Sequence, residues 1–204
     1  MKKFVKKRWP WILGVLILLL GIAAALCLLL KREPTTPGKP TLTVETPQKL
    51  SASQTEEFTL DVSVSHLGDG RYPAMSMSIA FDPSRLEFLG IEEGTVFVLS
   101  DENTVGQQLP EWNCNVENSN ATGRINIMYL DMTGGRNAFS KDLLAEDNNV
   151  VLRLKFRLRG SAGAGDVLDL TVEDAVFAAT DENLSLAMTT DTLRVKNGRL
   201  VIGE

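Results

Sequence analysis

The feature that most constrains this chain is the alternation of apolar and basic residues in the segment VVLRLKFRL, residues 150–158. The alternating apolar positions share one side of an extended chain: Val150, Leu152, Leu154, Phe156 and Leu158. The basic residues between them share the opposite side. A helix would spread the same apolar residues around its circumference, because its period is about 3.6 residues rather than two. The segment therefore predicts a β-strand with one buried and one solvated face.

The same period-2 pattern recurs through residues 41–204, with turn signals between the runs. The other predicted strands are 41–45, 57–64, 75–81, 86–91, 111–117, 124–130, 167–177 and 192–202. Asn197-Gly198 inside the last run is a type I′ hairpin signal that would divide it into two strands. Only residues 139–146 look helical. About nine one-sided strands predict an all-β fold, an antiparallel two-sheet β-sandwich with jelly-roll topology.

The first forty residues have a different composition and predict attachment to a membrane. Residues 1–8 carry five basic and no acidic side chains, and residues 9–30 carry no charge. A helix over this apolar run would be about 33 Å long, which spans a hydrocarbon core of about 30 Å. The charge bias places the basic N-terminus inside the cell. We therefore expect a cytoplasmic tail (1–8), one transmembrane signal-anchor helix (9–30), a Pro-rich linker (31–40) and an extracellular β-domain (41–204) at the cell membrane.

Two other interpretations of the N-terminal segment stay open. Residues 23–25, Ala-Ala-Ala, offer a cleavage site for a signal peptide, although the apolar run continues beyond them. Cys27 could be the lipidated residue of a lipoprotein, although Leu26 before it is a poor fit. The anchor is favoured because a cleaved signal usually has an apolar region of only about 7–15 residues.

Charge and composition exclude several functional classes. The chain has 26 acidic and 21 basic residues, and five of the basic ones lie within residues 1–8, so the β-domain is more acidic than the whole. Nucleic-acid binding is not expected, because it needs a basic surface. Catalysis by a nucleophile and a base is not expected either, since the single histidine, His66, lies in a loop-like stretch. Cys114 is interpreted as a small buried residue.

Carboxylate pairs and acidic clusters give little support for catalysis or metal binding. Glu92 and Glu93 are adjacent on a strand and point apart, whereas a glycosidase holds two carboxyls about 5–10 Å apart across a cleft. The oxygen-rich segments 142–149 and 181–183 lack the EF-hand pattern of Ca²⁺ ligands. We therefore expect no enzyme, no resident metal and no cofactor, with a structural Ca²⁺ in one of these oxygen-rich segments as the alternative.

Polysaccharide binding is the main alternative to protein binding. Sugar platforms use exposed aromatic faces, and Trp112 is the candidate sugar contact in this chain. One such residue does not make the flat aromatic row that a crystalline polysaccharide would need. A third possibility is a structural adhesion ectodomain.

Several motifs occur in an order that resembles the cohesin family. The run AMSMSIAFDPSRLEFLGIEEG (74–94) is similar to the family's alternating strand that ends in aromatic-Asp-Pro and is followed by a Leu-Glu strand. GRINIMYLDMTGG (123–135), AFSKDLLAEDNNVVLRLKFRL (138–158) and GDVLDLTVEDAVFA (165–178) follow in the expected sequence. Each motif alone is weak, but their order and spacing together cover nearly all of residues 41–202.

The resemblance implies a non-catalytic, nine-stranded jelly roll related to cellulose-binding modules. Such a module receives the dockerin of another protein, usually an enzyme that degrades polysaccharides, and Ca²⁺ belongs to the dockerin. By position, the implied binding face holds Ala74, Ser76, Ser78, Tyr129 and Asp131. Ser76 stands where a cohesin can carry an acidic or amide group, which puts partner choice in doubt. The alternation of residues 125–131 does not settle which side faces outward, so Tyr129 could equally cap the core.

Overall fold

The computed structural model describes residues 38–46, 49–53, 56–96, 114–131, 134–145, 148–160, 162–180 and 187–204. The predicted tail, the predicted transmembrane segment and residues 31–37 of the linker lie outside the described residues. Within the described residues, no helix is both long and apolar enough to cross a membrane. All elements described below belong to the compact unit Lys39–Glu204.

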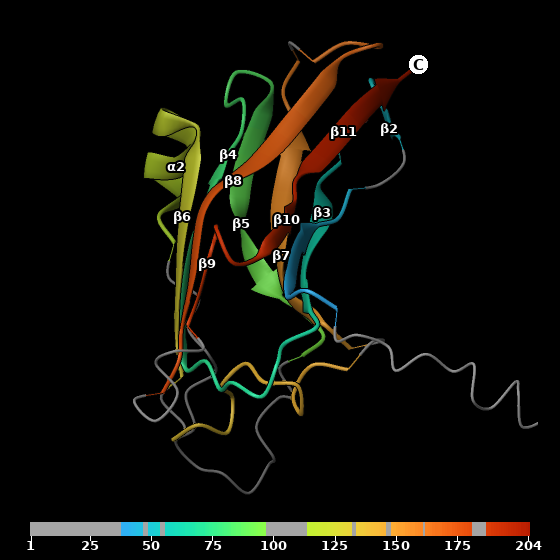
Figure 1. Ribbon diagram of the computed structural model, residues 1–204. Coiled ribbons are helices and arrows are strands. Elements are labelled where there is room, and N and C mark those ends of the chain that lie inside the picture. Colours follow the sequence, from blue (N-terminus) through green and yellow to red (C-terminus); the bar gives the residue numbers. More distant parts are fainter. Residues whose placement is uncertain are drawn as a thin grey trace, which may run out of the picture. The chain divides into compact units, whose positions relative to one another are not determined.

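The described residues form two β-sheets that face each other (Figure 1). The first sheet has the order β10 (Arg194–Lys196), β1 (Thr41–Val44), β3 (Phe58–Ser65), β7 (Val150–Leu158) and β5 (Leu86–Glu93). The second has the order β2 (Leu50–Ser51), β11 (Gly198–Gly203), β8 (Val167–Ala178), β4 (Ala74–Ala80) and β6 (Arg124–Leu130), and β9 (Met188–Thr189) pairs with β8. The predicted two-sheet sandwich is confirmed.

The core lies between the sheets and is made by the inward side of each alternating strand. In β4 the buried side chains are Met75, Met77 and Ile79, and the chain continues inward at Phe81. The rings of Phe81 and Phe156 are 5.6 Å apart, so they join β7 of one sheet to the end of β4 in the other. Phe88 of β5 completes this aromatic cluster, 5.5 Å from Phe156. The alternation that predicts the strands is therefore the pattern of burial.

Two details of the predicted topology are wrong. The sheets are not wholly antiparallel, because β10 runs parallel to β1 and β2 runs parallel to β11. Asn197-Gly198 divides the last run into two strands as predicted, but those strands belong to different sheets and make no hairpin. The Asn197 side chain instead accepts a hydrogen bond from the Val172 N–H, 3.0 Å away. At Gly198 a Cβ would lie 2.8 Å from Val44, so only glycine fits this crossing.

The predicted strand at 111–117 is also wrong in its described part, because Val116–Thr122 form the helix α2. Asn115 caps the helix by accepting a hydrogen bond from the Asn118 N–H at 2.8 Å. Gly123 ends it in the left-handed conformation, with φ of 71°. Conversely, the predicted helix at 139–146 is a turn in its described part, where the N–H groups of Leu143 and Leu144 both donate to the Ser140 carbonyl.

Helix α2 connects the edges of the two sheets. It directly precedes the edge strand β6, and its Asn120 side chain forms two hydrogen bonds with the edge strand β5. The Phe88 N–H donates to Asn120 Oδ1 at 2.9 Å, and Asn120 Nδ2 donates to the Phe88 carbonyl at 2.7 Å. These bonds lie where β5 shifts its register against β7, between Phe88 and Gly90. The helix therefore provides hydrogen-bond partners for the Phe88 N–H and carbonyl of β5, which β7 does not pair.

Candidate functional site

The outer side of β6, β4 and β8, called the candidate face below, is the surface to which the predicted binding residues of β4 point. The side chains of β4 on this side are all small: Ala74, Ser76, Ser78 and Ala80. They form a low stripe between the two flanking strands, with β6 paired along one side and β8 along the other. Small side chains let another backbone approach closely, as helix packing on a surface requires. Ala74, Ser76 and Ser78 share one outward side of β4, and their role in binding stays a prediction.

Strand β6 adds large exposed apolar side chains to the candidate face. Its pattern alternates strictly, with Arg124, Asn126, Met128 and Leu130 outward. Met128 is 59% exposed and Leu130 is 53% exposed, which is unusual for side chains of this size in the described part of the chain. Val176 and Ala178 of β8 lie opposite them across β4. Neighbouring exposed apolar side chains are a common feature of protein interaction sites.

Tyr129 does not belong to the candidate face, which corrects one predicted position. Its side chain is 1% exposed, its ring lies 4.8 Å from that of Phe139, and its hydroxyl donates to the Asn137 carbonyl at 2.7 Å. Burial, and next the negative charge of Asp131, raise the pKa of the Tyr129 phenol. The alternative that Tyr129 caps the core is therefore the correct one, and the neighbouring outward residues Met128 and Leu130 take its place.

Asp131 lies just past β6 and serves the following turn. Its carboxylate accepts a hydrogen bond from the Gly135 N–H at 2.8 Å, and its side chain is half-buried. The structure therefore places Asp131 directly after β6 and gives it a local structural contact. Trp112, the candidate sugar contact, lies outside the described residues.

The candidate face is ordered in rows that cross the three strands. Leu130, Ala74 and Ala178 form one row, and Met128, Ser76 and Val176 form the next. The third row is polar and consists of Asn126, Ser78 and Asp174, with Ser78 donating to Asn126 Oδ1 at 2.7 Å. In the fourth row, Ala80 lies between Arg124 and Thr171. The face therefore changes from apolar to polar along the strands.

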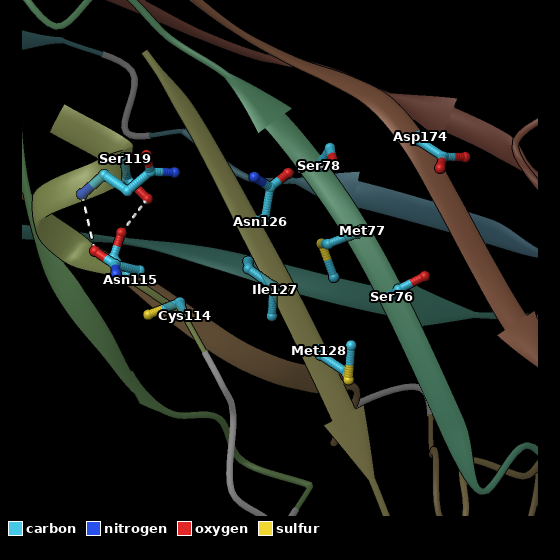
Figure 2. Close-up of a pocket in the computed structure, with 11 residues that line it drawn as sticks. Ser76, Met77, Ser78, Cys114, Asn115, Ser119, Asn126, Ile127, Met128 and Asp174 are labelled. Atoms are coloured by element: carbon cyan, nitrogen blue, oxygen red, sulfur yellow. Dashed lines mark hydrogen bonds between the residues drawn. The ribbon is translucent and has the colours of Figure 1, made fainter. Parts of the chain in front are cut away.

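A shallow depression of about 360 Å³ lies over the second and third rows. Figure 2 shows its floor on β4 and β6, with the start of α2 beyond β6 and Asp174 of β8 beyond β4. A β-bulge at residues 173–174 makes the side chains of two consecutive acidic residues of β8, Glu173 and Asp174, both point outward. Glu173 forms an ion pair with Arg124, reaching across the small Ala80. The depression is thus bounded by a helix on one side and a bulged acidic strand on the other.

The outer side of β3, β7 and β5, called the charged face below, has a different chemistry. The basic residues Arg153, Lys155 and Arg157 of β7 are flanked by acidic residues from both neighbouring strands. Lys155 Nζ lies 2.7 Å from Glu57 and 3.3 Å from Glu92, while Arg157 lies 2.7 Å from Glu57 and 3.4 Å from Glu87. Arg153 pairs with Asp61 at 3.0 Å. The hydrogen bond from Lys155 lowers the pKa of Glu57, and the same contact raises the pKa of Lys155.

The remaining sequence candidates show no catalytic arrangement in the described residues. His66 is exposed and its Nδ1 lies 3.0 Å from the Ser65 hydroxyl. Cys114 is half-buried beside the depression, and burial raises the pKa of its thiol. Among the described residues, no three His, Cys, Asp or Glu side chains are grouped so that they could hold a metal ion. The candidate face is therefore suited to binding rather than to chemistry.

Comparison with known proteins agrees with this description. The cohesin domain family model matches residues 42–195. No curated protein matches the chain. Among solved structures, the OlpA cohesin of Clostridium thermocellum in complex with the Doc918 dockerin is 17% identical, with a TM-score of 0.58, covering 81% of this chain and 99% of that chain.

Two further solved structures have the same fold. The sixth cohesin of scaffoldin B from Acetivibrio cellulolyticus, in complex with a mutant Cel5 dockerin, is 16% identical, with a TM-score of 0.57, covering 80% of this chain and 98% of that one. A cohesin module from a family 33 glycoside hydrolase of Clostridium perfringens is 11% identical, with a TM-score of 0.55, covering 81% of this chain and 97% of that one. Since the family model covers most of its length, this chain belongs to the cohesin domain family.

Proposed function

We propose that the candidate face binds the dockerin module of another protein. The family membership supports this, because cohesin modules are non-catalytic binding domains, and it agrees with the expectation that this chain is not an enzyme. The OlpA and scaffoldin B cohesins were both solved with a dockerin bound. The observation in this chain that carries the proposal is the exposure of Met128 and Leu130 beside the small-residue stripe of β4.

The energetics favour the candidate face as the docking surface. Fully burying a Met or Leu side chain contributes about 1.5–3 kcal/mol. The stripe of Ala and Ser between β6 and β8 removes the bulk that would keep a partner helix away from these two side chains. Aromatic anchors are absent from the described outward positions of β4 and β6, so Met128 and Leu130 are the expected hot spots.

The charged face is a poor competitor for the same role. Its basic side chains already have acidic partners within 2.7 to 3.4 Å. A partner that covered them would remove several charges from water, and the interaction of those charges with each other would not fully repay this desolvation. We therefore assign binding to one face of the sandwich only.

The cellular context is part of the proposal. The uncharged segment 9–30 would hold the domain at the outer surface of the cell membrane, with the Pro-rich segment 31–40 as spacer. The partners would be dockerin-bearing enzymes that degrade polysaccharides. Ca²⁺ would be bound by the dockerin, whose loops would need the ion in order to fold, so binding would depend on Ca²⁺.

The test is calorimetry of the full chain in detergent solution against the dockerin modules encoded by the same organism. We expect at least one to bind in the presence of Ca²⁺ and to lose binding on addition of a chelator. The double variant M128A/L130A should raise the dissociation constant by about 30-fold or more, which corresponds to a loss of about 2 kcal/mol of binding free energy. Its thermal midpoint should stay near that of the wild type, because both side chains are exposed.

The matched control is Val167→Ala. Val167 is a large apolar side chain that is 41% exposed on β8, well away from the rows that contain Met128 and Leu130. This variant should bind like the wild type. Binding to no dockerin, or equal effects of the control and the double variant, would contradict the proposal. Binding to a polysaccharide that is lost on Trp112→Ala would instead support a carbohydrate-binding module.

A further inference from the structure

We infer that the depression on the candidate face receives a lysine or arginine side chain of the docked module, with Asp174 as its charged partner. This inference rests on the proposed dockerin binding and states which chemistry the partner must present beside its apolar contact. It follows from the charge of Asp174, from the other side chains around the depression, and from the spacing of the rows.

Asp174 is the carboxylate of the β8 bulge that has no basic partner among the residues that the structure describes. The adjacent Glu173 is neutralised by Arg124. The Asp174 carboxylate has the Thr190 hydroxyl at 3.4 Å, and no ion pair of Asp174 occurs among the described residues. It is exposed and directed outward beside Ser78. A single negative charge is therefore available for an incoming group.

The other side chains around the depression suit an amphipathic cation. The described lining contains hydroxyls, carboxamides, a thiol and the Met128 thioether, and none of its residues is basic. Hydroxyl and carboxamide oxygens can accept the additional N–H donors of a guanidinium or ammonium group. The Met128 side chain offers an apolar surface for the methylene stem of the same residue. Charge complementarity therefore favours lysine or arginine over an acidic or a purely apolar side chain.

The spacing of the rows fits the length of such a side chain. Asp174 lies in the row next to the one that holds Met128, Ser76 and Val176. Rows on the same side of a sheet are two residues apart, which is about 7 Å along the strands. A long basic side chain that starts above the Met128 row can extend over this distance to the carboxylate. The apolar contacts and the charge contact can then come from one partner surface.

The bulge and α2 shape the place where the cation would enter. The bulge turns Asp174 outward, and α2 raises a wall beyond β6 that includes Asn115 (Figure 2). A helix that lies along the β4 stripe is thereby confined between these two sides. The polar row with Asp174 and the apolar row with Leu130 lie on opposite sides of the Met128 row, so the two ends of a docked surface meet different chemistry.

The test compares two carboxylates of β8 by calorimetry with a dockerin that binds the wild-type chain. Asp174→Asn should weaken binding by about tenfold in 0.05 M salt, and the loss should shrink in 0.5 M salt because exposed charges are screened. Asp169→Asn is the matched control, since Asp169 is an exposed carboxylate of the same strand that faces Arg199 at 3.8 Å. It should leave the dissociation constant unchanged.

A charge reversal makes the test independent of any general loss of affinity. Asp174→Lys should abolish binding, and replacing the responsible Lys or Arg of that dockerin by Glu should restore it. Equal binding of Asp174→Asn, Asp169→Asn and the wild type would overturn the inference while leaving dockerin binding in place. If no dockerin binds the wild type, the proposed function fails first and this inference fails with it.

Discussion

The two outer faces of this sandwich are made by the same kind of alternating strand, but they carry opposite chemistry. On the charged face Arg153, Lys155 and Arg157 of β7 are neutralised by acidic side chains of β3, of β5 and of Glu57, which directly precedes β3. On the candidate face the central strand β4 carries only Ala and Ser outward, and β6 beside it exposes Met128 and Leu130. A face whose charges are paired internally gains little from a partner, whereas exposed apolar side chains beside small residues gain by being covered.

The largest expected effect concerns the core that supports both faces. Phe156→Ala removes a fully buried ring that contacts Phe81 and Phe88, so unfolding should cost about 3–5 kcal/mol less than in the wild type. Arg157→Ala, the next residue on the charged face, should cost about 1 kcal/mol or less, because its ion pairs are exposed. Denaturant unfolding of both variants measures the difference. Equal losses would contradict the assignment of inward and outward sides.

A smaller effect is expected where α2 joins the two sheets. Asn120→Ala leaves the Phe88 N–H and carbonyl at the edge of β5 without their side-chain partner, which should lower stability by about 1–3 kcal/mol. Asn118→Ala, on the exposed side of the same helix, keeps those bonds and should cost less than about 0.5 kcal/mol. Thermal unfolding of the two variants decides the point. The prediction fails if Asn118→Ala is the more damaging change.

The smallest expected effect is a pH dependence of stability that comes from the charged face and not from the candidate face. The folded-state pKa of Glu57 lies below its ordinary value of 4.5, because Lys155 donates a hydrogen bond to it. Its contribution to stability is therefore complete above the unfolded pKa and is lost as the pH falls through the folded pKa. The wild type should have a higher thermal midpoint than Glu57→Gln at pH 6, and the gap should close toward pH 3. A gap that stays constant, or dockerin binding that changes in Glu57→Gln at pH 6, would argue against this separation of roles.

The strands and their buried sides could be predicted because both depend on local alternation. The predicted inward residues of β4 and the inward leucines and Phe156 of β7 are all buried, and the strand ends agree closely with the structure. The charged ladder could not be predicted in detail. It depends on the register of β3 and β5 against β7, and this register is determined by contacts between residues that are far apart in the chain.

Tyr129 shows where alternation is not enough. Both sides of β6 are rich in apolar residues, with Ile125, Ile127 and Tyr129 on one side and Met128 and Leu130 on the other. The pairing with β4 decides the question, because Met77 opposite Ile127 is buried. Arg124 and Asn126 are polar and share the side of Met128. Their polarity is the sequence signal that could have identified this side as the outward one.

The error at α2 had a different cause. The residues of NVENSNATG lack a helical apolar stripe, so alternation favoured a strand. The stronger signals were at the ends, where Asn115 can cap the first turn and Gly123 can adopt a positive φ. Those two end residues therefore define α2, the helix that borders the depression.

The central claim, that dockerin binds one face and not the other, is tested most directly by blocking each face with one bulky side chain. Ser76→Trp places an indole in the middle of the candidate face, and Thr59→Trp places one on β3, opposite Lys155 on the charged face. Both positions are exposed, so both variants should fold. Calorimetry with a dockerin that binds the wild type should show no binding to Ser76→Trp and wild-type affinity for Thr59→Trp. Wild-type affinity for Ser76→Trp, or loss of binding only in Thr59→Trp, would contradict the account.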